Sequence, residues 1–520
     1  MLIWFALIIY GIAPVTVLFL KRQKREEGLI WLVLLACGLL GSILLYLSPI
    51  TSTRSDSPVL WFSSGSMILS IDGYWNNPEW VIAQCISIYL LVFLSRQYHE
   101  REKLSLPLEK IIFVFCCVIF GLLTLSLHKE FALTTILFCL DIFRLVIRVI
   151  RNKELFSSQR DTLSLLLRLV SIVLMVYLAA RVDPEGYEAG LFSIFPLVVT
   201  VIASRIAADF IDQISADQFT GENLHGWLMF LDFVTMVSLL ILLPEQTGNT
   251  AGILLYSLVF FGMLLLLLTY LWIFRSRSHE NRIWIFFFAM SLTLFFFLLG
   301  IRQELLFLML PICFLMINSP LHDGKRGIEI VLLICEGIFL LGFTFSPFYL
   351  LNKNLLNVPN LLPFKYFALI MEGVYLAGWV ITQRRFELQG SETEKGSASR
   401  ELTPAMFVGG LCLIIYKGFF PLDGFNQIAW FAFSPLVMYL LVPIHALLKR
   451  GYHAEKNYDP LQAHAQATRF VDTVMRVFLV VGDVIRQLFE AISTLLEREA
   501  GLIWAIIFLV LLLTLFKGLS

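Results

Sequence analysis

Residues Phe131 to Ile150 read FALTTILFCLDIFRLVIRVI, and this stretch carries the pattern that decides the fold. A run of this length that is apolar all round predicts a membrane-spanning helix. Asp141 interrupts it near the middle, with Arg144 one turn further on. Because a carboxylate at bilayer depth is costly, we expect Asp141 to face protein or a wet cavity. Asp141 is either half of a structural ion pair with Arg144 or one station of a charge relay, and the stretch alone favours the pair.

The composition extends this prediction to the whole chain. Of 520 residues, 58% are hydrophobic and 15% are charged, and the mean hydropathy is +0.81. A soluble domain does not need so much apolar surface, so the fold class is an all-α, polytopic membrane protein. The formal net charge is zero, which argues against a nucleic-acid partner.

Sequence motifs of enzymes and cofactor sites are absent. The chain has no HExxH, GxSxG, GxGxxG or P-loop pattern. Its eight cysteines lie within apolar runs, without the spacing of a metal site or a redox pair. His225, His322 and His445 are isolated from one another. We therefore predict no catalytic residue, no metal and no cofactor in this chain.

Apolar runs separated by charged or Pro/Gly breaks predict about sixteen membrane spans. The break between the tenth and eleventh spans is the short sequence Gly300-Ile301-Arg302. The first run, from Met1 to Leu20, lacks a basic start and a cleavage site, so we expect it to be a retained span. The predicted spans are 2–20, 28–47, 79–95, 109–126, 131–150, 163–180, 189–208, 226–243, 251–273, 283–300, 303–317, 328–350, 364–382, 405–420, 428–447 and 500–518.

The Lys/Arg distribution predicts the orientation. With the N-terminus outside, 23 Lys and Arg residues lie in the inner stretches 21–27, 96–103, 148–160, 275–282, 325–326, 383–403 and 449–456, and the outer loops hold six. This asymmetry predicts a multi-pass protein of the inner (cytoplasmic) membrane with both termini on the outer side. The predicted inner loop 209–225 is an exception, because it is acidic and has no Lys or Arg.

Three longer stretches lie between the spans. The outer loop 48–78 contains MILSIDGYW, which could form a strand of a short hairpin, and 383–403 is a polar linker. Between 470 and 496, apolar residues recur at steps of three and four, which predicts an amphipathic helix lying flat on the inner side. The predicted domains are 1–108 (N-terminal spans), 109–382 (central bundle), 383–403 (linker), 404–460 (C-terminal spans), 461–498 (amphipathic lateral helix) and 499–520 (final span).

Further charged residues fall at membrane depth. They are Arg205, Asp232, Glu336 and Glu372, each within an apolar run. Alternating acidic and basic groups suit a proton path, and they equally suit a bundle held together by internal ion pairs. Arginine hardly releases its proton. An arginine in place of a lysine therefore favours a structural or electrostatic-gating role over proton transfer.

Several segments resemble the antiporter-like membrane subunits of respiratory complex I. WFSSGSMILSIDGYW (61–75) followed by LSRQY (94–98) is similar to the first conserved segment of that family, and GLLTLSLHKEFALTTILFCLDIF (121–143) is similar to its next helix pair. RSRSHENRIWIFFFAMS (275–291) and EGIFLLGFTFSPFYLLNKNLL (336–356) resemble two later segments. The number of spans and the helix before the last span also match the largest member of the group.

The resemblance implies a proton or ion path through particular residues. Asp141 stands at or near a family Glu, Arg205 is nearest to a key Lys, and Asp232 stands where a His is usual. Arg282 lies at or beside one family lysine and Lys353 at another. The path candidates are Asp141, Arg144, Arg205, Asp232, Arg282, Glu336 and Lys353.

The function that the resemblance implies is a membrane-arm subunit of a redox-driven proton- or cation-translocating assembly. Its partners would be other membrane subunits and the lipid bilayer, and the substitutions of the path residues suggest a divergent, partly structural member. The alternatives are a stand-alone or Mrp-type cation/proton antiporter, a structural spacer subunit, and a polytopic glycosyl- or lipid-transferase. The transferase would use acidic residues of the outer loops, namely Asp72, Glu79, Asp183 and Glu185.

Overall fold

The computed structural model describes most of the first three-quarters of the chain. It covers residues 2–389 except 23–26, 51–58, 65–66, 72–74, 101–107, 128–129, 153–158, 182–190, 217–222, 243–250, 276–279, 319–335, 338, 341–345 and 359–361. The spans predicted at 405–420, 428–447 and 500–518 and the amphipathic helix at 470–496 lie outside the described residues, so they stay predictions.

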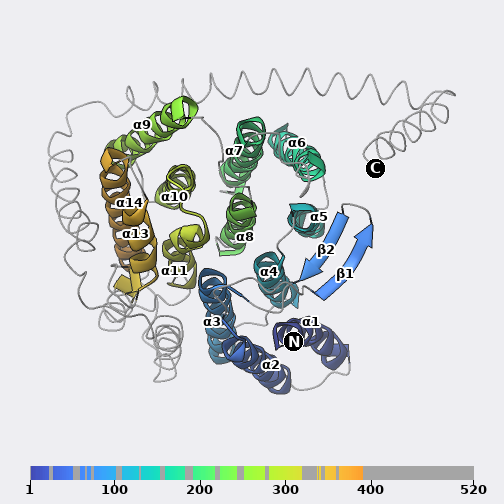
Figure 1. The fold of residues 1–520 in the computed structure, drawn as a ribbon. Coiled ribbons are helices and arrows are strands. Elements are labelled where there is room, and N and C mark those ends of the chain that lie inside the picture. Colours follow the sequence, from blue (N-terminus) through green and yellow to red (C-terminus); the bar gives the residue numbers. More distant parts are fainter. Residues whose placement is uncertain are drawn as a thin grey trace.

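The described elements are almost all helices (Figure 1). The first part comprises α1 (Leu2–Arg22), α2 (Glu27–Leu47), β1 (Val59–Ser64), β2 (Met67–Ile71), α3 (Asn77–Glu100), α4 (Leu108–Ser126), α5 (Glu130–Asn152), α6 (Gln159–Arg181), α7 (Leu191–Ala216) and α8 (Asn223–Leu242). The second comprises α9 (Ala251–Arg275), α10 (Glu280–Leu298), the 3-10 helix η1 (Gln303–Met309), α11 (Leu310–Asn318), α13 (Pro347–Asn357) and α14 (Leu362–Gln389).

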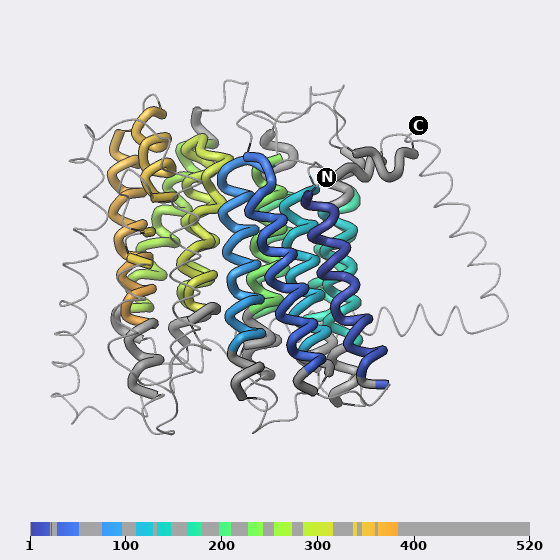
Figure 2. The backbone as a smooth tube through the Cα atoms, turned by 90° about the horizontal axis from the view of Figure 1, so that it is seen from below, coloured from blue at the N-terminus to red at the C-terminus, as the bar shows by residue number. Residues whose placement is uncertain are grey.

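The long helices run side by side and form a membrane bundle (Figure 2). Among the described residues, five helices are long and apolar enough to cross a membrane: α1, α2, α3, α9 and α14. Large apolar side chains such as Phe19 (62% exposed), Leu32 (63%) and Met263 (64%) cover the outer faces of α1, α2 and α9. Such continuous apolar surface is typical of helices that lie in a membrane.

The interior of the bundle is built around α3, α8, α10, η1 and α11. α8 occupies a central position (Figure 1) and packs against α4, α5, α7 and η1. Aromatic side chains such as Trp80, Phe230 and Phe288 are fully buried there. These helices are apolar on every side because they have helix neighbours all round.

The structure has helices at most of the predicted spans that fall within the described residues, and it corrects the predicted bounds in three places. The predicted inner loop at 209–225 is wrong at its start, because α7 continues to Ala216. The span predicted at 328–350 is not continuous, because Ser346 has extended backbone angles and caps the N-terminus of α13. The start of the predicted linker 383–403 is helical, because α14 runs to Gln389. The predicted hairpin strand is present as β2, paired antiparallel with β1.

The break between α10 and η1 is a glycine turn at the predicted position. Gly300 has a φ of +91°. Its N–H donates to the carbonyl of Phe297, and the N–H of Ile301 donates to the carbonyl of Phe296. These two bonds are those of a Schellman motif, which satisfies carbonyls at a helix C-terminus and favours glycine at the left-handed residue. The chain can therefore leave α10 abruptly and enter η1.

Replacing Gly300 with alanine tests this turn. A Cβ there would meet no atom within 4 Å, so the expected cost, about 1–2 kcal/mol, comes from the left-handed backbone alone. Thermal unfolding in detergent should show a lower midpoint. Gly11→Ala is the matched control, since Gly11 is helical and its Cβ also meets nothing within 4 Å. Gly11→Ala should be neutral or stabilising, and equal effects of the two substitutions would contradict the turn assignment.

Candidate functional site

Six charged side chains from four neighbouring helices meet inside the bundle. α5 supplies Asp141 and Arg144, α6 supplies Arg168, α7 supplies Arg205 and Asp209, and α8 supplies Asp232. Residues three or four apart share one helix face, so Asp141/Arg144 and Arg205/Asp209 each project toward the same neighbours. We call these six residues the charge network.

Asp141 is bound chiefly by an arginine from another helix. Arg205 donates from Nη1 to Asp141 Oδ1 at 3.0 Å and from Nη2 to Oδ2 at 2.5 Å. This two-point contact is the geometry in which a planar guanidinium holds a carboxylate most strongly. Arg168 Nη1 adds a longer contact of 3.5 Å to Oδ1. The carboxylate is therefore shared between α6 and α7.

The other two aspartates bind the other two arginines. Arg144 Nη1 donates to Asp209 Oδ1 at 2.8 Å, and its Nη2 lies 2.8 Å from Asp232 Oδ2. Arg168 donates from Nη2 to Asp209 and from Nη1 to Asp232 at 3.2 Å. Arg205 Nη1 also lies 3.6 Å from Asp232 Oδ1. Each aspartate thus faces at least two arginines, and all four helices are joined by ion pairs.

The charge network is balanced and shielded from solvent. It contains three arginines and three aspartates, and the most exposed of the six residues, Arg144, is 9% exposed. An unpaired charge in such a setting costs several kcal/mol, whereas a charge with hydrogen-bonded partners of opposite sign is tolerated. The balance therefore explains how six ionised groups coexist with the surrounding apolar side chains.

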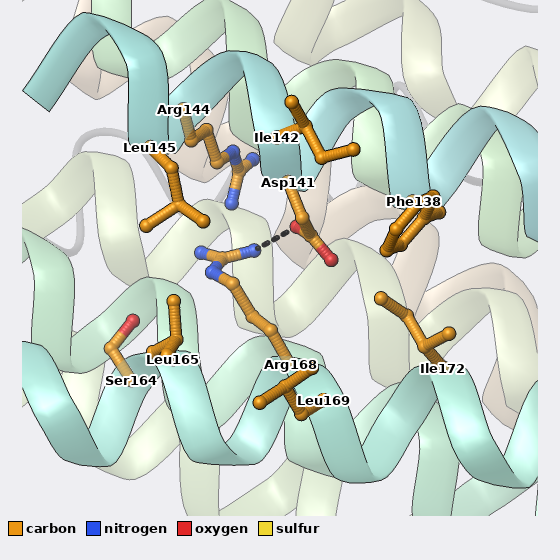
Figure 3. A pocket seen from close by; sticks show the side chains of 10 residues that line it. All are labelled: Phe138, Asp141, Ile142, Arg144, Leu145, Ser164, Leu165, Arg168, Leu169 and Ile172. Atoms are coloured by element: carbon orange, nitrogen blue, oxygen red, sulfur yellow. Dashed lines mark hydrogen bonds and ion pairs between the residues drawn. The ribbon is translucent and has the colours of Figure 1, made fainter.

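A small pocket reaches the charge network from between α5 and α6 (Figure 3). Its volume is about 60 Å³, and Asp141, Arg144 and Arg168 line its polar part. The remaining wall is Ser164 and apolar side chains, including Phe138 and Leu169. Arg205 and Asp232 lie deeper, at 1% and 2% exposed.

The predicted pair of Asp141 with Arg144 is wrong. Asp141 binds Arg205 and Arg168, whereas Arg144 binds Asp209 and faces Asp232. Neighbours on one helix point outward side by side, so the adjacent helices supply the better-oriented partners.

The structure places some of the other predicted site residues in the charge network and others elsewhere. Arg205 and Asp232 join the charge network, as described above. Lys353 lies on α13, partly exposed, and forms no ion pair among the described residues. Glu336 is fully buried in a stretch described only in short pieces. Arg282 lies in the first turn of α10, and its side chain is outside the described set. Roles for these three residues stay predictions.

Two members of the charge network, Arg168 and Asp209, were not among the predicted site residues. Arg168 interrupts the apolar run LSLLLRLVSIVL, so the criterion that selected Arg205 would also have selected it. Asp209 is the first residue of the predicted acidic inner loop 209–225, because the preceding span is predicted to end at 208. It lies one helical turn after Arg205, and that spacing was the signal that could have placed it inside the bundle.

The second part of the bundle holds acidic side chains with neutral partners. Asn352 donates to Glu372 Oε1 at 3.1 Å, and Asn354 donates to Glu304 Oε1 at 2.6 Å. Lys365 donates to the carbonyls of Leu356 and Val358 at the end of α13. No group of three or more His, Cys, Asp or Glu side chains with a metal-binding arrangement occurs in the described part of the chain.

The transferase alternative depends on four acidic residues, of which the structure describes one. Glu79 is 7% exposed in the first turn of α3, where its Oε2 accepts the N–H of Asn76. That contact belongs to the start of a helix and does not need a substrate. Asp72, Asp183 and Glu185 lie outside the described residues.

Neutralising one or both members of the Asp141–Arg205 pair measures how much the pair contributes to the stability of the folded protein. Asp141→Asn leaves an excess positive charge in the charge network, and we expect a loss of about 3–5 kcal/mol in stability. Asp141→Asn combined with Arg205→Gln restores the balance at two arginines and two aspartates, so the double variant should be more stable than the single one. Thermal unfolding of the purified protein in detergent provides the comparison.

A matched control removes an acid elsewhere. Glu304→Gln neutralises a partly exposed carboxylate whose described partner is the neutral Asn354. Its cost should stay within about 1.5 kcal/mol, the range of one hydrogen bond. A double variant less stable than Asp141→Asn would show that charge balance does not govern this site.

Comparisons with solved structures show a likeness in fold. No family model and no curated protein matches this chain. One chain of the Mrp complex from Dietzia sp. DQ12-45-1b is similar, with a TM-score of 0.58 and 13% sequence identity. The match covers 100% of this chain and 63% of that chain, so this chain spans less than two-thirds of the length of its structural neighbour. The chain therefore shares its fold with that chain of the Mrp complex.

Proposed function

We propose that this chain is a membrane subunit of a cation/proton antiporter-type assembly, of the Mrp or complex I-like kind. The fold likeness to a chain of the Mrp complex supports this, together with the sequence resemblance described above. The apolar outer faces of α1, α2 and α9 offer surfaces for other membrane subunits or lipid. In this proposal the redox cofactors, where the assembly has them, belong to partner subunits.

Within that assembly, the charge network fixes the helices of the bundle and does not relay protons. The observation that carries this proposal is the chemistry of its members: all three cations are arginines, and each carboxylate faces at least two of them. A guanidinium holds its proton at every physiological pH, unlike a lysine or a histidine. Each aspartate of the charge network has guanidinium groups of two or three arginines as its partners.

A relay needs groups that gain and lose protons in turn. In the charge network, protonating one aspartate would leave three arginines facing two carboxylates, an unbalanced positive charge within an apolar bundle that costs several kcal/mol. No lysine or histidine takes part in the described ion pairs of α5–α8. The arrangement is therefore better suited to hold α5, α6, α7 and α8 at one depth and one rotation than to pass protons between them.

Proton translocation by the assembled double variant separates the two roles. We expect Asp141→Asn with Arg205→Gln to assemble and to retain most of the wild-type translocation rate, because the remaining charges are balanced. The rate is measured in vesicles with a pH-sensitive dye and is normalised to the amount of assembled complex. Assembly at wild-type yield with translocation abolished would make the pair part of the proton path, as the relay alternative requires.

The orientation of the chain is a separate part of the proposal. We propose that both termini face the outer side of the cytoplasmic membrane, from the Lys/Arg asymmetry of the loops. A reporter fused after Ser520 and one inserted at 48–58 should both be accessible from outside, whereas a reporter at 390–398 should be accessible only from inside. Finding the reporters at 520 and 395 on the same side would rule out the sixteen-span arrangement.

A further inference from the structure

A carboxylate and an amide meet in the second part of the bundle, where α13 packs against α14. Glu372 is at the middle of the membrane span Leu362–Thr382 in α14, and Asn352 is at the middle of α13. Asn352 Nδ2 donates to Glu372 Oε1 at 3.1 Å, and both residues are 1% exposed. α13 and α14 lie on the opposite side of the bundle from α5 and α6 (Figure 1), so this contact is separate from the charge network.

The amide of Asn352 has an acceptor atom that the described protein leaves unused. Its Oδ1 atom is buried and accepts no hydrogen bond. A buried acceptor without a donor is unfavourable. The amide therefore donates with one end, while its other end favours a group that can donate to it.

The two ends of an amide are a donor and an acceptor of nearly equal size. When Glu372 is ionised, the N–H end of Asn352 fits its oxygen, which is the arrangement in the structure. When a proton is bound at Oε1, that oxygen becomes a donor, and the carbonyl end of the same amide can accept from it after a half-turn. Each protonation state of the carboxyl group thus has a hydrogen-bond partner without a change in the packing of α13 against α14.

The charge network does not have this property. Arginine is a donor only, so no arginine can accept a hydrogen bond from a protonated aspartate. Proton uptake there also unbalances the charges, as described above. At the Glu372–Asn352 contact the partner is uncharged, so proton uptake takes no carboxylate away from a guanidinium.

Three titratable side chains around this contact have hydrogen bonds to other partners. Lys365 donates to carbonyls at the end of α13, Tyr375 donates to a carbonyl of η1, and Glu304 accepts from Asn354. Asn352, in contrast, is bound to Glu372 directly and can follow its proton. Glu336 lies upstream of α13, and the other titratable side chains described on α9, α10, α11, α13 and α14 are Tyr256, Tyr270, Cys313, Tyr349, Lys353 and Tyr366.

From these features we propose that Glu372 and Asn352 form a proton-binding site at the middle of the membrane, and that the Asn352 amide turns over when the proton binds. A proton taken up from water binds Glu372 Oε1, and the new O–H donates to Asn352 Oδ1. Release of the proton to water restores the N–H donor contact. A metal ion needs several oxygen ligands, whereas a proton needs one acceptor beyond the oxygen that carries it. The site deepens the proposed function, on which it rests for the use of the proton.

Infrared difference spectroscopy of the purified full chain in detergent tests this site. Spectra recorded at a series of pH values detect the C=O stretch of a carboxyl group that gains or loses a proton. Glu372→Gln keeps the shape of the side chain and cannot titrate, so we expect it to remove one pH-dependent band. In the wild-type protein with isotopically labelled asparagine, the C=O stretch of one side-chain amide should shift at the same pH, because Oδ1 gains a hydrogen bond.

Two leucine variants of α13 test the role of the amide. Asn352→Leu is similar in size and offers neither a donor nor an acceptor, so the Glu372 band should lose its pH dependence and the asparagine shift should disappear. Asn354→Leu is the matched control, since Asn354 binds the partly exposed Glu304, where water can replace the amide. This control should leave both signals unchanged.

Other outcomes would overturn the proposal. A band that persists in Glu372→Gln would mean that a different carboxyl group exchanges the proton. Wild-type protein without the asparagine shift would mean that the amide keeps one orientation, and this measurement does not depend on the folding of any variant. Equal effects of Asn352→Leu and Asn354→Leu would mean that the contact with Glu372 has no special role. The spectra are read without transport, so failure of this site is distinguishable from failure of the proposed function.

Discussion

The structure depends on a single electrostatic constraint: three guanidinium groups and three carboxylates must reach one another inside an apolar bundle. Each ionised group would be costly alone at membrane depth, and the cost is offset only when the partners come from neighbouring helices in the correct orientation. Helices α5, α6, α7 and α8 are therefore limited to one combination of depth and rotation. Apolar packing alone would tolerate sliding and turning far more readily, since lipid tails and Leu side chains are similar environments.

The central helix α8 transmits this constraint to the rest of the bundle. Asp232 joins the charge network, while the apolar side chains of α8 pack against α4, η1 and α11. The Gly300 turn brings η1 back into the bundle, where it also contacts α3 and α10. The buried helix α8 thus links the charge network to the apolar packing of both parts of the bundle.

The charge network has an inner and an outer layer, and the two layers suit different roles. Arg205, Asp209 and Asp232 are at most 2% exposed and have only protein around them. Asp141, Arg144 and Arg168 line the α5–α6 pocket and approach the lipid boundary. The resemblance to complex I subunits implied a lysine near Arg205 and a histidine near Asp232, both of which exchange protons more readily. With arginine and aspartate in these places, the polar centre of this bundle consists of guanidinium–carboxylate pairs.

The sequence by itself determined most of the described helices, the membrane depth of three of the six charges of the network, and where one helix ends. Apolar run lengths located the described spans, the Gly300-Ile301-Arg302 break was found at its observed place, and Asp141, Arg205 and Asp232 were recognised at membrane depth. Only the tertiary structure decided which charges pair. Asp141 binds Arg205, 64 residues away, and not Arg144, three residues away. Helical spacing fixes the face on which a side chain lies, but the partner on that face is supplied by the packing of another helix. Arg168 and Asp209 belong to the site for the same reason, since their contacts arise only when α6 and α7 pack against α5 and α8.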